Sequence, residues 1–210
     1  MNSLRFGIIG SGSWATALAK MLTDNQNTIA WWIRNERYRV HLEQRKHNAA
    51  HLTSVPFDVS LLRTSSNIRE VIAQSEVIVL STPSAYVESA FAGLPANELE
   101  GKKVLSAVKG LLPEKNILIN QYLQEKFNLP IEDYFAVLGP CHAEEVASEK
   151  LSYLTFSGVD GAMASIIASH FSTHYINTVV NNDILGVQYA AVLKNIYAIG
   201  AGIAHGLDYG

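Results

Sequence analysis

The 210-residue sequence has little cysteine, little charge and no excess of basic residues. Its single cysteine, Cys141, excludes a disulfide framework and favours a reducing compartment, so we expect a cytoplasmic protein. The 16 basic and 19 acidic side chains leave a net charge of −3, which argues against a nucleic-acid partner. No signal peptide is evident, and no apolar run approaches the roughly 18 residues that cross a bilayer, so no membrane span is expected.

Charged residues make up only 17% of the chain, whereas a typical protein has about 25%. A separate globule of this length needs more surface charge than that. We therefore expect either that a partner covers much of the surface, as in a homodimer, or that part of the protein is absent.

Short β-branched runs alternate with helical patterns over residues 1–182. This alternation predicts an α/β domain with a doubly wound, mostly parallel sheet and helices on both faces. The expected strands are 4–9, 28–33, 61–64, 77–80, 104–108, 135–138, 151–156 and 175–180. The expected helices are 14–22, 36–46, 68–73, 86–92, 117–126 and 162–171.

Residues 184–204 are apolar nearly all round, which predicts a helix that is buried on every side, with Asp183 as its N-cap. A buried helix needs covering elements, yet the chain stops at Gly210. We therefore expect residues 183–210 to begin an all-helical second domain that is largely missing.

A glycine-rich turn follows the first expected strand. The run Gly10-Ser11-Gly12-Ser13-Trp14-Ala15 fits the pattern G-x-G-x-x-[GA] between a strand and a helix. In this position Gly10 makes the tight turn, Gly12 admits a pyrophosphate, and the helix N-terminus presents N–H groups to the phosphates. The turn predicts a Rossmann-type dinucleotide site; a tight turn without a ligand is the alternative.

The end of the second expected strand predicts which cofactor is bound. No acidic residue lies between Asp24 and Glu36, and the strand ends at Arg34 and Asn35. An arginine at this position can accept a 2′-phosphate or stack on adenine, so NADPH is allowed, a preference for it stays open, and NAD(P)H is the expected cofactor. A solvated charge is the alternative interpretation of Arg34.

Three other loops follow expected strands and should reach the same crevice, because ligands bind at the carboxyl ends of such strands. They contain STPS with the candidate cofactor contact Pro83, KG with Lys109, and GPCHA with Cys141. Lys109 is placed to hold an anion or a substrate hydroxyl, although a solvated loop lysine would occupy the same position. Cys141 and its neighbours His142, Glu144 and Glu145 lack a second cluster at ligand spacing, so no metal is predicted.

Lys194 lies in the last helix with apolar residues three and four positions away on either side. Burying an ammonium is costly unless it is paired or functional, so Lys194 is the expected catalytic proton carrier. A lysine that extends to the surface is the alternative. Asn195, beside it, is a candidate for orienting the substrate.

These segments together resemble NAD(P)-dependent glycerol-3-phosphate dehydrogenases of the soluble bacterial type. The matching stretches are GIIGSGSWATALA, WWIRN, SAVKGL, VLGPCHAEEVA and DILGVQYAAVLKNIYAIGAGIAHGL. The resemblance implies reversible reduction of dihydroxyacetone phosphate to sn-glycerol 3-phosphate, which supplies phospholipid synthesis. It also implies cofactor contacts at Ser13, Trp14, Arg34 and Ala143, a cofactor and substrate contact at Lys109, substrate contacts at Gly139 and Cys141, and a proton acceptor at Lys194.

The sequence departs from the family pattern at three positions and in its length. Cys141 stands where Ser or Thr is usual, His142 where an aromatic is common, and Gln188 where an acid is common. The family continues for roughly another hundred residues. That part carries an aspartate, an Arg-Asn pair for the substrate phosphate and a glutamate for the cofactor, so we expect this chain alone to be weakly active or inactive.

Two other functions stay open. A β-hydroxyacid or 6-phosphogluconate-type dehydrogenase shares the two-domain plan, but its usual motif is Lys-x-x-x-Asn, whereas Lys194 and Asn195 are adjacent. A non-catalytic, nucleotide-sensing Rossmann module would explain the phosphate turn. It would not explain why Lys109 and Lys194 should converge on one crevice.

Overall fold

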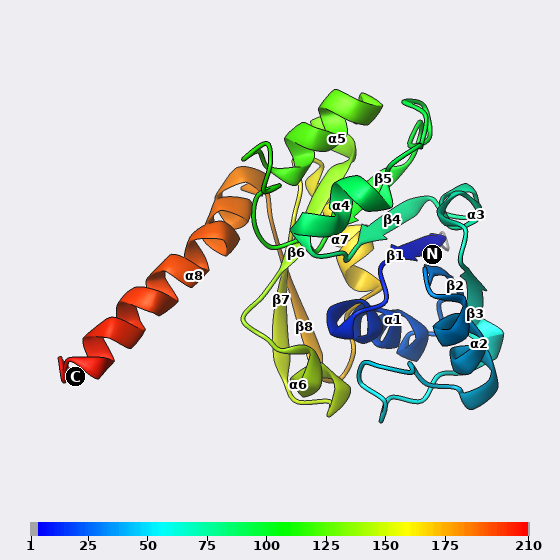
Figure 1. The fold of residues 1–210 in the computed structure, drawn as a ribbon, viewed down its shortest axis with the longest axis horizontal. Coiled ribbons are helices and arrows are strands. Elements are labelled where there is room, and N and C mark those ends of the chain that lie inside the picture. Colours follow the sequence, from blue (N-terminus) through cyan, green and yellow to red (C-terminus); the bar gives the residue numbers. More distant parts are fainter. Residues whose placement is uncertain (1–3, 210) are drawn as a thin grey trace.

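The computed structural model describes residues 4–209, apart from the side chain of Asn195. Its centre is an eight-stranded sheet in the order β3-β2-β1-β4-β5-β6-β7-β8 (Figure 1). The strands are β1 (Phe6–Ile9), β2 (Ile29–Trp32), β3 (Leu62–Ser65), β4 (Val77–Leu80), β5 (Lys103–Ser106), β6 (Tyr134–Leu138), β7 (Ser152–Ser157) and β8 (Ile176–Asn181). The helices are α1 (Ser13–Asp24), α2 (Glu36–Arg45), α3 (Ile68–Ala73), α4 (Ser84–Ala90), α5 (Ile119–Phe127), α6 (Ala143–Ala147), α7 (Gly161–Ser169) and α8 (Ile184–Gly206). The predicted doubly wound α/β fold is confirmed.

The strand directions divide the sheet into two parts. Strands β1 to β6 are all parallel to one another. Strand β7 pairs antiparallel with β6, and β8 is parallel to β7. The chain order reverses between β1 and β4, which are neighbours in the sheet. Loops diverge at such a switch point and leave a crevice at the carboxyl ends of the strands.

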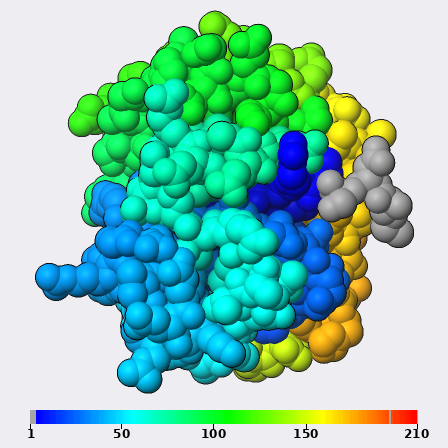
Figure 2. All heavy atoms as spheres, turned by 90° about the vertical axis from the view of Figure 1, so that its right-hand side faces the viewer, coloured from blue at the N-terminus to red at the C-terminus, as the bar shows by residue number. Residues whose placement is uncertain are grey.

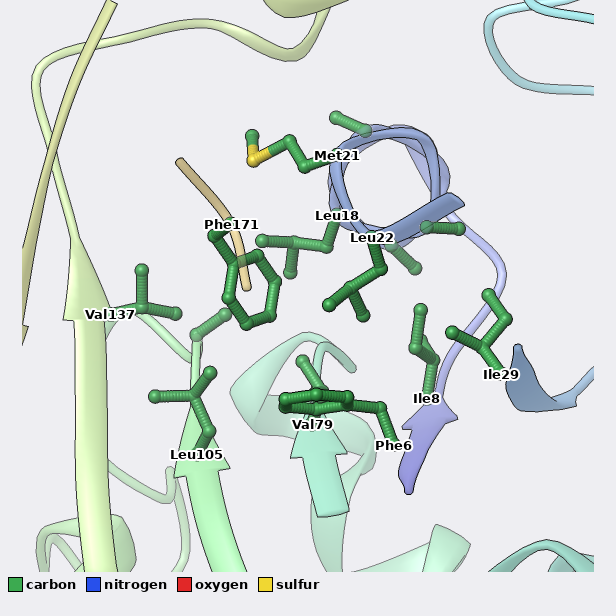
Figure 3. Packing of buried hydrophobic residues seen from close by; sticks show 14 of the residues in the cluster. Phe6, Ile8, Leu18, Met21, Leu22, Ile29, Val79, Leu105, Val137 and Phe171 are labelled. Carbon is green, nitrogen blue, oxygen red and sulfur yellow. The ribbon is translucent and has the colours of Figure 1, made fainter. Parts of the chain in front are cut away.

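Two hydrophobic clusters hold the layers together, one on each face of the sheet. The first packs side chains of α1, α6 and α7 on the sheet, and the second packs α3, α4, α5 and the start of α8. Figure 3 shows Leu18 and Leu22 of α1 in the cluster, with Leu18 pointing toward Phe171. Because helices cover both faces of the central strands, the side chains on both faces are apolar. Full burial of one such side chain contributes about 2 kcal/mol.

The start of α8 is fixed to β6 by a buried polar contact. The hydroxyl of Tyr134 donates a hydrogen bond to Gln188 Oε1 at 3.0 Å, and Gln188 Nε2 donates to the carbonyl of Ile184 at 3.0 Å. Ile184 and Gln188 are both buried. The amide of Gln188 thereby gives the buried phenol hydroxyl of Tyr134 a hydrogen-bond partner.

Beyond these first turns α8 projects away from the sheet (Figure 1). Its apolar side chains are exposed there, among them Ile196, Ile199 and Ile203. The prediction that this helix is buried on every side is therefore wrong for the described chain, because no described element covers its distal half.

This segment also corrects the statement that no apolar run approaches the length of a membrane span. Within residues 4–209, α8 is one helix that is long enough, at 23 residues, and apolar enough to cross a membrane by those two criteria alone. The sequence-based statement that no run approaches this length overlooked it. A core helix of a soluble protein satisfies the same criteria, and Lys194 lies near the middle of α8.

Candidate active site

The glycine-rich turn between β1 and α1 is shaped for a ligand rather than for a side chain. Gly10 has a φ of +128°, and a Cβ there would lie 2.4 Å from the carbonyl oxygen of Ser81, so only glycine fits. A Cβ on Gly12 would meet nothing within 4 Å. Helix α1 has no side-chain cap and no acidic residue in its first turn, whereas Asn35 caps α2 and Asp183 caps α8. The first N–H groups of α1 are thus left for an anion.

The turn is held in shape from behind. The indole of Trp31 donates to the carbonyl of Gly10 at 2.7 Å. The buried amide of Asn48 donates to the carbonyl of Ser11 at 3.0 Å and to Thr16 Oγ1 at 2.8 Å, while its oxygen accepts two backbone N–H groups of its own loop. Sequence reasoning missed Asn48, since a buried asparagine in an irregular polar loop leaves no periodic signal.

Three adjoining cavities lie at the carboxyl ends of the strands. The central cavity, of about 440 Å³, is lined by Gly12–Trp14, Ser81–Ser84, Ala107–Lys109 and Cys141–Glu144. The outer cavity, of about 290 Å³, is lined by Gly10–Gly12, Trp32, Arg34, His51, Ser81–Pro83, Tyr86 and Ala90. The α8 cavity, of about 400 Å³, is lined by Lys109, Leu138–Pro140, Thr155, Val187, Ala190, Ala191 and Lys194. Gly12 and Pro83 connect the first two cavities, and Lys109 connects the first with the third.

Most of the predicted site residues line these cavities, and Asn35 does not. Asn35 is the N-cap of α2, where its Oδ1 accepts from the backbone N–H of Arg37 at 3.0 Å. Asn35 was predicted to contact the cofactor, but it lines none of the three cavities. The side chain of Asn195 lies outside the described residues.

The two predicted lysines reach the α8 cavity from different elements. Lys109 follows β5, and its Nζ lies 5.7 Å from the ring centroid of Trp14 at the start of α1. Lys194 is on α8, opposite the loop that follows β6. It is exposed, so the prediction of a buried ammonium is wrong: its apolar neighbours on α8 are themselves uncovered. Neither lysine forms an ion pair with a described residue.

The loop after β6 approaches the cavities closely. A Cβ on Gly139 would lie 2.4 Å from the carbonyl oxygen of Tyr153, so this glycine permits contact between the loop and β7. Cys141 is buried in the wall of the central cavity. Burial raises the pKa of its thiol, while the charge of Lys109 acts in the opposite direction. The thiol is therefore neutral at neutral pH and offers a weak hydrogen bond.

The cavity walls contain polar atoms that still lack partners. Trp14 Nε1 and Ser81 Oγ are buried and form no hydrogen bond in the described chain, and both residues line the central cavity. Together with the open space at Gly12, these atoms fit a polar ligand such as a dinucleotide. Within residues 4–209, no three His, Cys, Asp or Glu side chains are grouped to hold a metal ion. Fold and site define a Rossmann-type nucleotide-binding domain of the dehydrogenase kind.

Comparisons with known proteins identify the family. The family described as "NAD-dependent glycerol-3-phosphate dehydrogenase N-terminus" matches residues 5–164, and the corresponding C-terminal family matches residues 183–210. The chain belongs to the NAD-dependent glycerol-3-phosphate dehydrogenase family, as its motifs predicted.

Similar proteins are longer than this chain. The glycerol-3-phosphate dehydrogenase [NAD(P)+] of Chlorobium chlorochromatii is 31% identical over 208 residues, which cover 99% of this chain and 62% of that protein. That of Streptococcus equi subsp. zooepidemicus is 32% identical over 212 residues, with 100% and 62% covered. The structure of the Plasmodium falciparum glycerol-3-phosphate dehydrogenase matches with a TM-score of 0.88 at 27% identity, over 98% of this chain and 60% of that one. The chain thus spans about 62% of the length of the curated relatives it matches.

Proposed function

We propose that the complete protein is a cytoplasmic oxidoreductase that reversibly reduces dihydroxyacetone phosphate to sn-glycerol 3-phosphate with NAD(P)H, and so supplies phospholipid synthesis. The observation that carries this proposal is the convergence of Lys109 and Lys194 on one cavity next to the phosphate-binding turn. The proposed substrate is taken from the names of the relatives. In this proposal residues 1–182 form the dinucleotide-binding domain and residues 183–210 begin the substrate domain.

The fit of the cavities suggests how NAD(P)H is held. The N–H groups at the start of α1 and the backbone at Gly12 would hold the pyrophosphate. Arg34 would hold the adenosine end, since it lines the outer cavity. Trp14, Pro83 and Ala143, which line the central cavity, would surround the remainder of the cofactor. When bound, the nicotinamide supplies the hydride that the reduction needs.

The side chains around the α8 cavity would serve the substrate. The Nζ of Lys194 would give a proton to the substrate oxygen in the reductive direction and accept it in the reverse direction. Lys109, an exposed cation that lines both the central and the α8 cavity, would hold the anionic substrate beside the cofactor. The neutral thiol of Cys141 would contribute one weak hydrogen bond, and the backbone at Gly139, which lines the α8 cavity, would contact the substrate.

The test is oxidation of NADH and NADPH by dihydroxyacetone phosphate, measured on this chain and on the complete protein side by side. We expect turnover in the complete protein and little or none in this chain. Lys194→Ala in the complete protein should lower kcat by at least about 100-fold and leave cofactor affinity within about twofold. Lys150→Ala, an exposed lysine outside the three cavities, is the matched control.

Two results would overturn the proposal. Absence of turnover in the complete protein, with cofactor still bound, would exclude dihydroxyacetone phosphate as the substrate and favour another carbonyl substrate or a nucleotide sensor. Full turnover in Lys194→Ala would remove Lys194 from the proton transfer.

A further inference from the structure

The outer cavity contains basic side chains and no acidic one. Of the residues that line it, Arg34 carries a permanent charge, and His51 contributes an imidazole. Glu36 lies two residues after Arg34 in the chain and is the first residue of α2. It is nevertheless absent from the cavity wall.

A network of ion pairs on α2 explains why Glu36 is absent. Arg39 Nε donates to Glu36 Oε2 at 2.9 Å, and a second guanidinium nitrogen donates to Glu36 Oε1. Arg39 also binds Glu43, which accepts a hydrogen bond from Thr64 in β3. Glu43 is thereby held against the edge strand β3, and Glu36 is held at the exposed start of α2, so neither carboxylate lines the cavity over the ends of β1, β2 and β4.

The electrostatics of Glu36 agree with this geometry. Hydrogen bonds from Arg39 and, to a smaller extent, from Ser66 lower the pKa of Glu36 to about 2, so the carboxylate stays charged and paired over the physiological range. Ser66 directly follows β3. Figure 2 shows α2 and the segment that follows it as a continuous surface at this edge of the sheet. Arg34, in contrast, forms no ion pair with a described residue.

We propose that Arg39 determines cofactor preference by holding Glu36 away from the outer cavity, so that Arg34 selects a 2′-phosphate over a 2′-hydroxyl and the protein prefers NADPH. An acidic residue at this place in a Rossmann fold binds the ribose 2′-hydroxyl and repels a 2′-phosphate, while an arginine attracts it. Arg39 is in this inference a positioning residue, since it acts through Glu36. The inference rests on the cofactor site of the proposed function and adds the determinant of its specificity.

The test compares two fragments of the cofactors, 2′,5′-ADP and 5′-AMP, by isothermal titration calorimetry on the 210-residue chain. These probes differ only in the 2′-phosphate, and their binding does not require turnover. We expect the wild-type chain to bind 2′,5′-ADP more tightly. Arg34→Gln should weaken 2′,5′-ADP about tenfold and leave 5′-AMP almost unchanged. Arg39→Gln should weaken 2′,5′-ADP about fivefold, because it releases a carboxylate toward the phosphate.

A second substitution separates this positioning role from a loss of helix stability. Glu36→Gln added to Arg39→Gln removes the released carboxylate and should restore the wild-type preference, although the ion pair is still missing. Damage to α2 would not be repaired in this way. Arg37→Gln, on the same helix and outside the cavity wall, is the matched control and should change neither affinity.

The outcomes separate the two proposals. Equal affinity for both nucleotides, an unchanged ratio in Arg39→Gln, or no restoration in the double variant would each overturn the role of Arg39. If neither nucleotide binds, the cofactor site itself is overturned, and with it the proposed function. Binding of both, combined with inactivity of the complete protein toward dihydroxyacetone phosphate, would overturn the proposed reaction alone.

Discussion

Replacing Asn48 with alanine should weaken both the fold and nucleotide binding, because its amide joins an irregular loop to the phosphate-binding turn. The side chain is 4% exposed and takes part in four hydrogen bonds, two as donor and two as acceptor. At about 1 kcal/mol net for each bond, the upper figure is about 4 kcal/mol. Water can reach some of the released backbone groups, so we expect the free energy of unfolding to fall by about 2–3 kcal/mol.

Urea denaturation measures the first effect and nucleotide titration the second. With a slope of about 2 kcal/mol/M, the midpoint should fall by about 1–1.5 M at unchanged slope. NADPH affinity should fall as well, because the carbonyl of Ser11 loses its partner and the turn is less fixed.

Asn67→Ala is the matched control for Asn48→Ala. Asn67 is an exposed N-cap of α3 that accepts from the N–H of Arg69 at 3.0 Å, so its loss should cost about 1 kcal/mol and leave nucleotide binding intact. The role of Asn48 is refuted if the free energy of unfolding of its alanine variant lies within about 0.5 kcal/mol of the wild type, or if that variant binds NADPH as tightly as the wild type does.

Two other predictions concern pH and the glycine turn. Burial lowers the pKa of His170, so between that lowered value and about 6.5 the unfolded chain takes up a proton that the folded chain does not, and the free energy of unfolding falls as pH falls. His170→Gln should flatten this dependence in urea titrations from pH 8 to pH 5; an equal slope in both proteins would contradict the assignment. Gly12→Ala should leave stability within about 0.5 kcal/mol but weaken NADPH at least tenfold, since it fills the open space at the turn. Gly10→Ala should instead destabilise by more than about 2 kcal/mol, owing to its positive φ and the clash with Ser81; similar thermal unfolding of the two variants would show that the turn is not built as described.

The strands and most helices were predictable because their signals are local. Residues 77–80 are apolar at every position and form β4 with the expected bounds, and α3 also begins and ends where predicted. The antiparallel direction of β7 was not specified, since side-chain alternation does not encode strand direction. Helix α6 was missed because five residues are too few to show a helical period.

The candidate site was predictable where its residues follow strands. Gly10 comes directly after β1, and Lys109 and Cys141 come three residues after β5 and β6; parallel strands bring their carboxyl ends to the same end of the sheet. Asn48 and the pairing of Glu36 with Arg39 could not be foreseen, because they depend on how loops and side chains fold over one another. The exposure of Lys194 was also unforeseen: an apolar helix indicates that covering elements are needed but not which elements supply them.

The reversal of direction at β7 decides where α8 can carry Lys194. Because β7 and β8 run opposite to β6, the chain leaves β8 at the end of the sheet that lies opposite the cavities. The first turns of α8 then lead back from Tyr134, at the start of β6, toward Leu138 at its end. From Gln188, which is hydrogen-bonded to Tyr134, to Lys194, which lines the α8 cavity, the helix advances by six residues or about 9 Å. The spacing along α8 therefore sets the direction of the Lys194 side chain. Insertion or deletion of one residue between Asp183 and Lys194 would turn the lysine by about 100° away from Lys109. A parallel β7 would have started the same helix at the cavity edge and carried the lysine away from it.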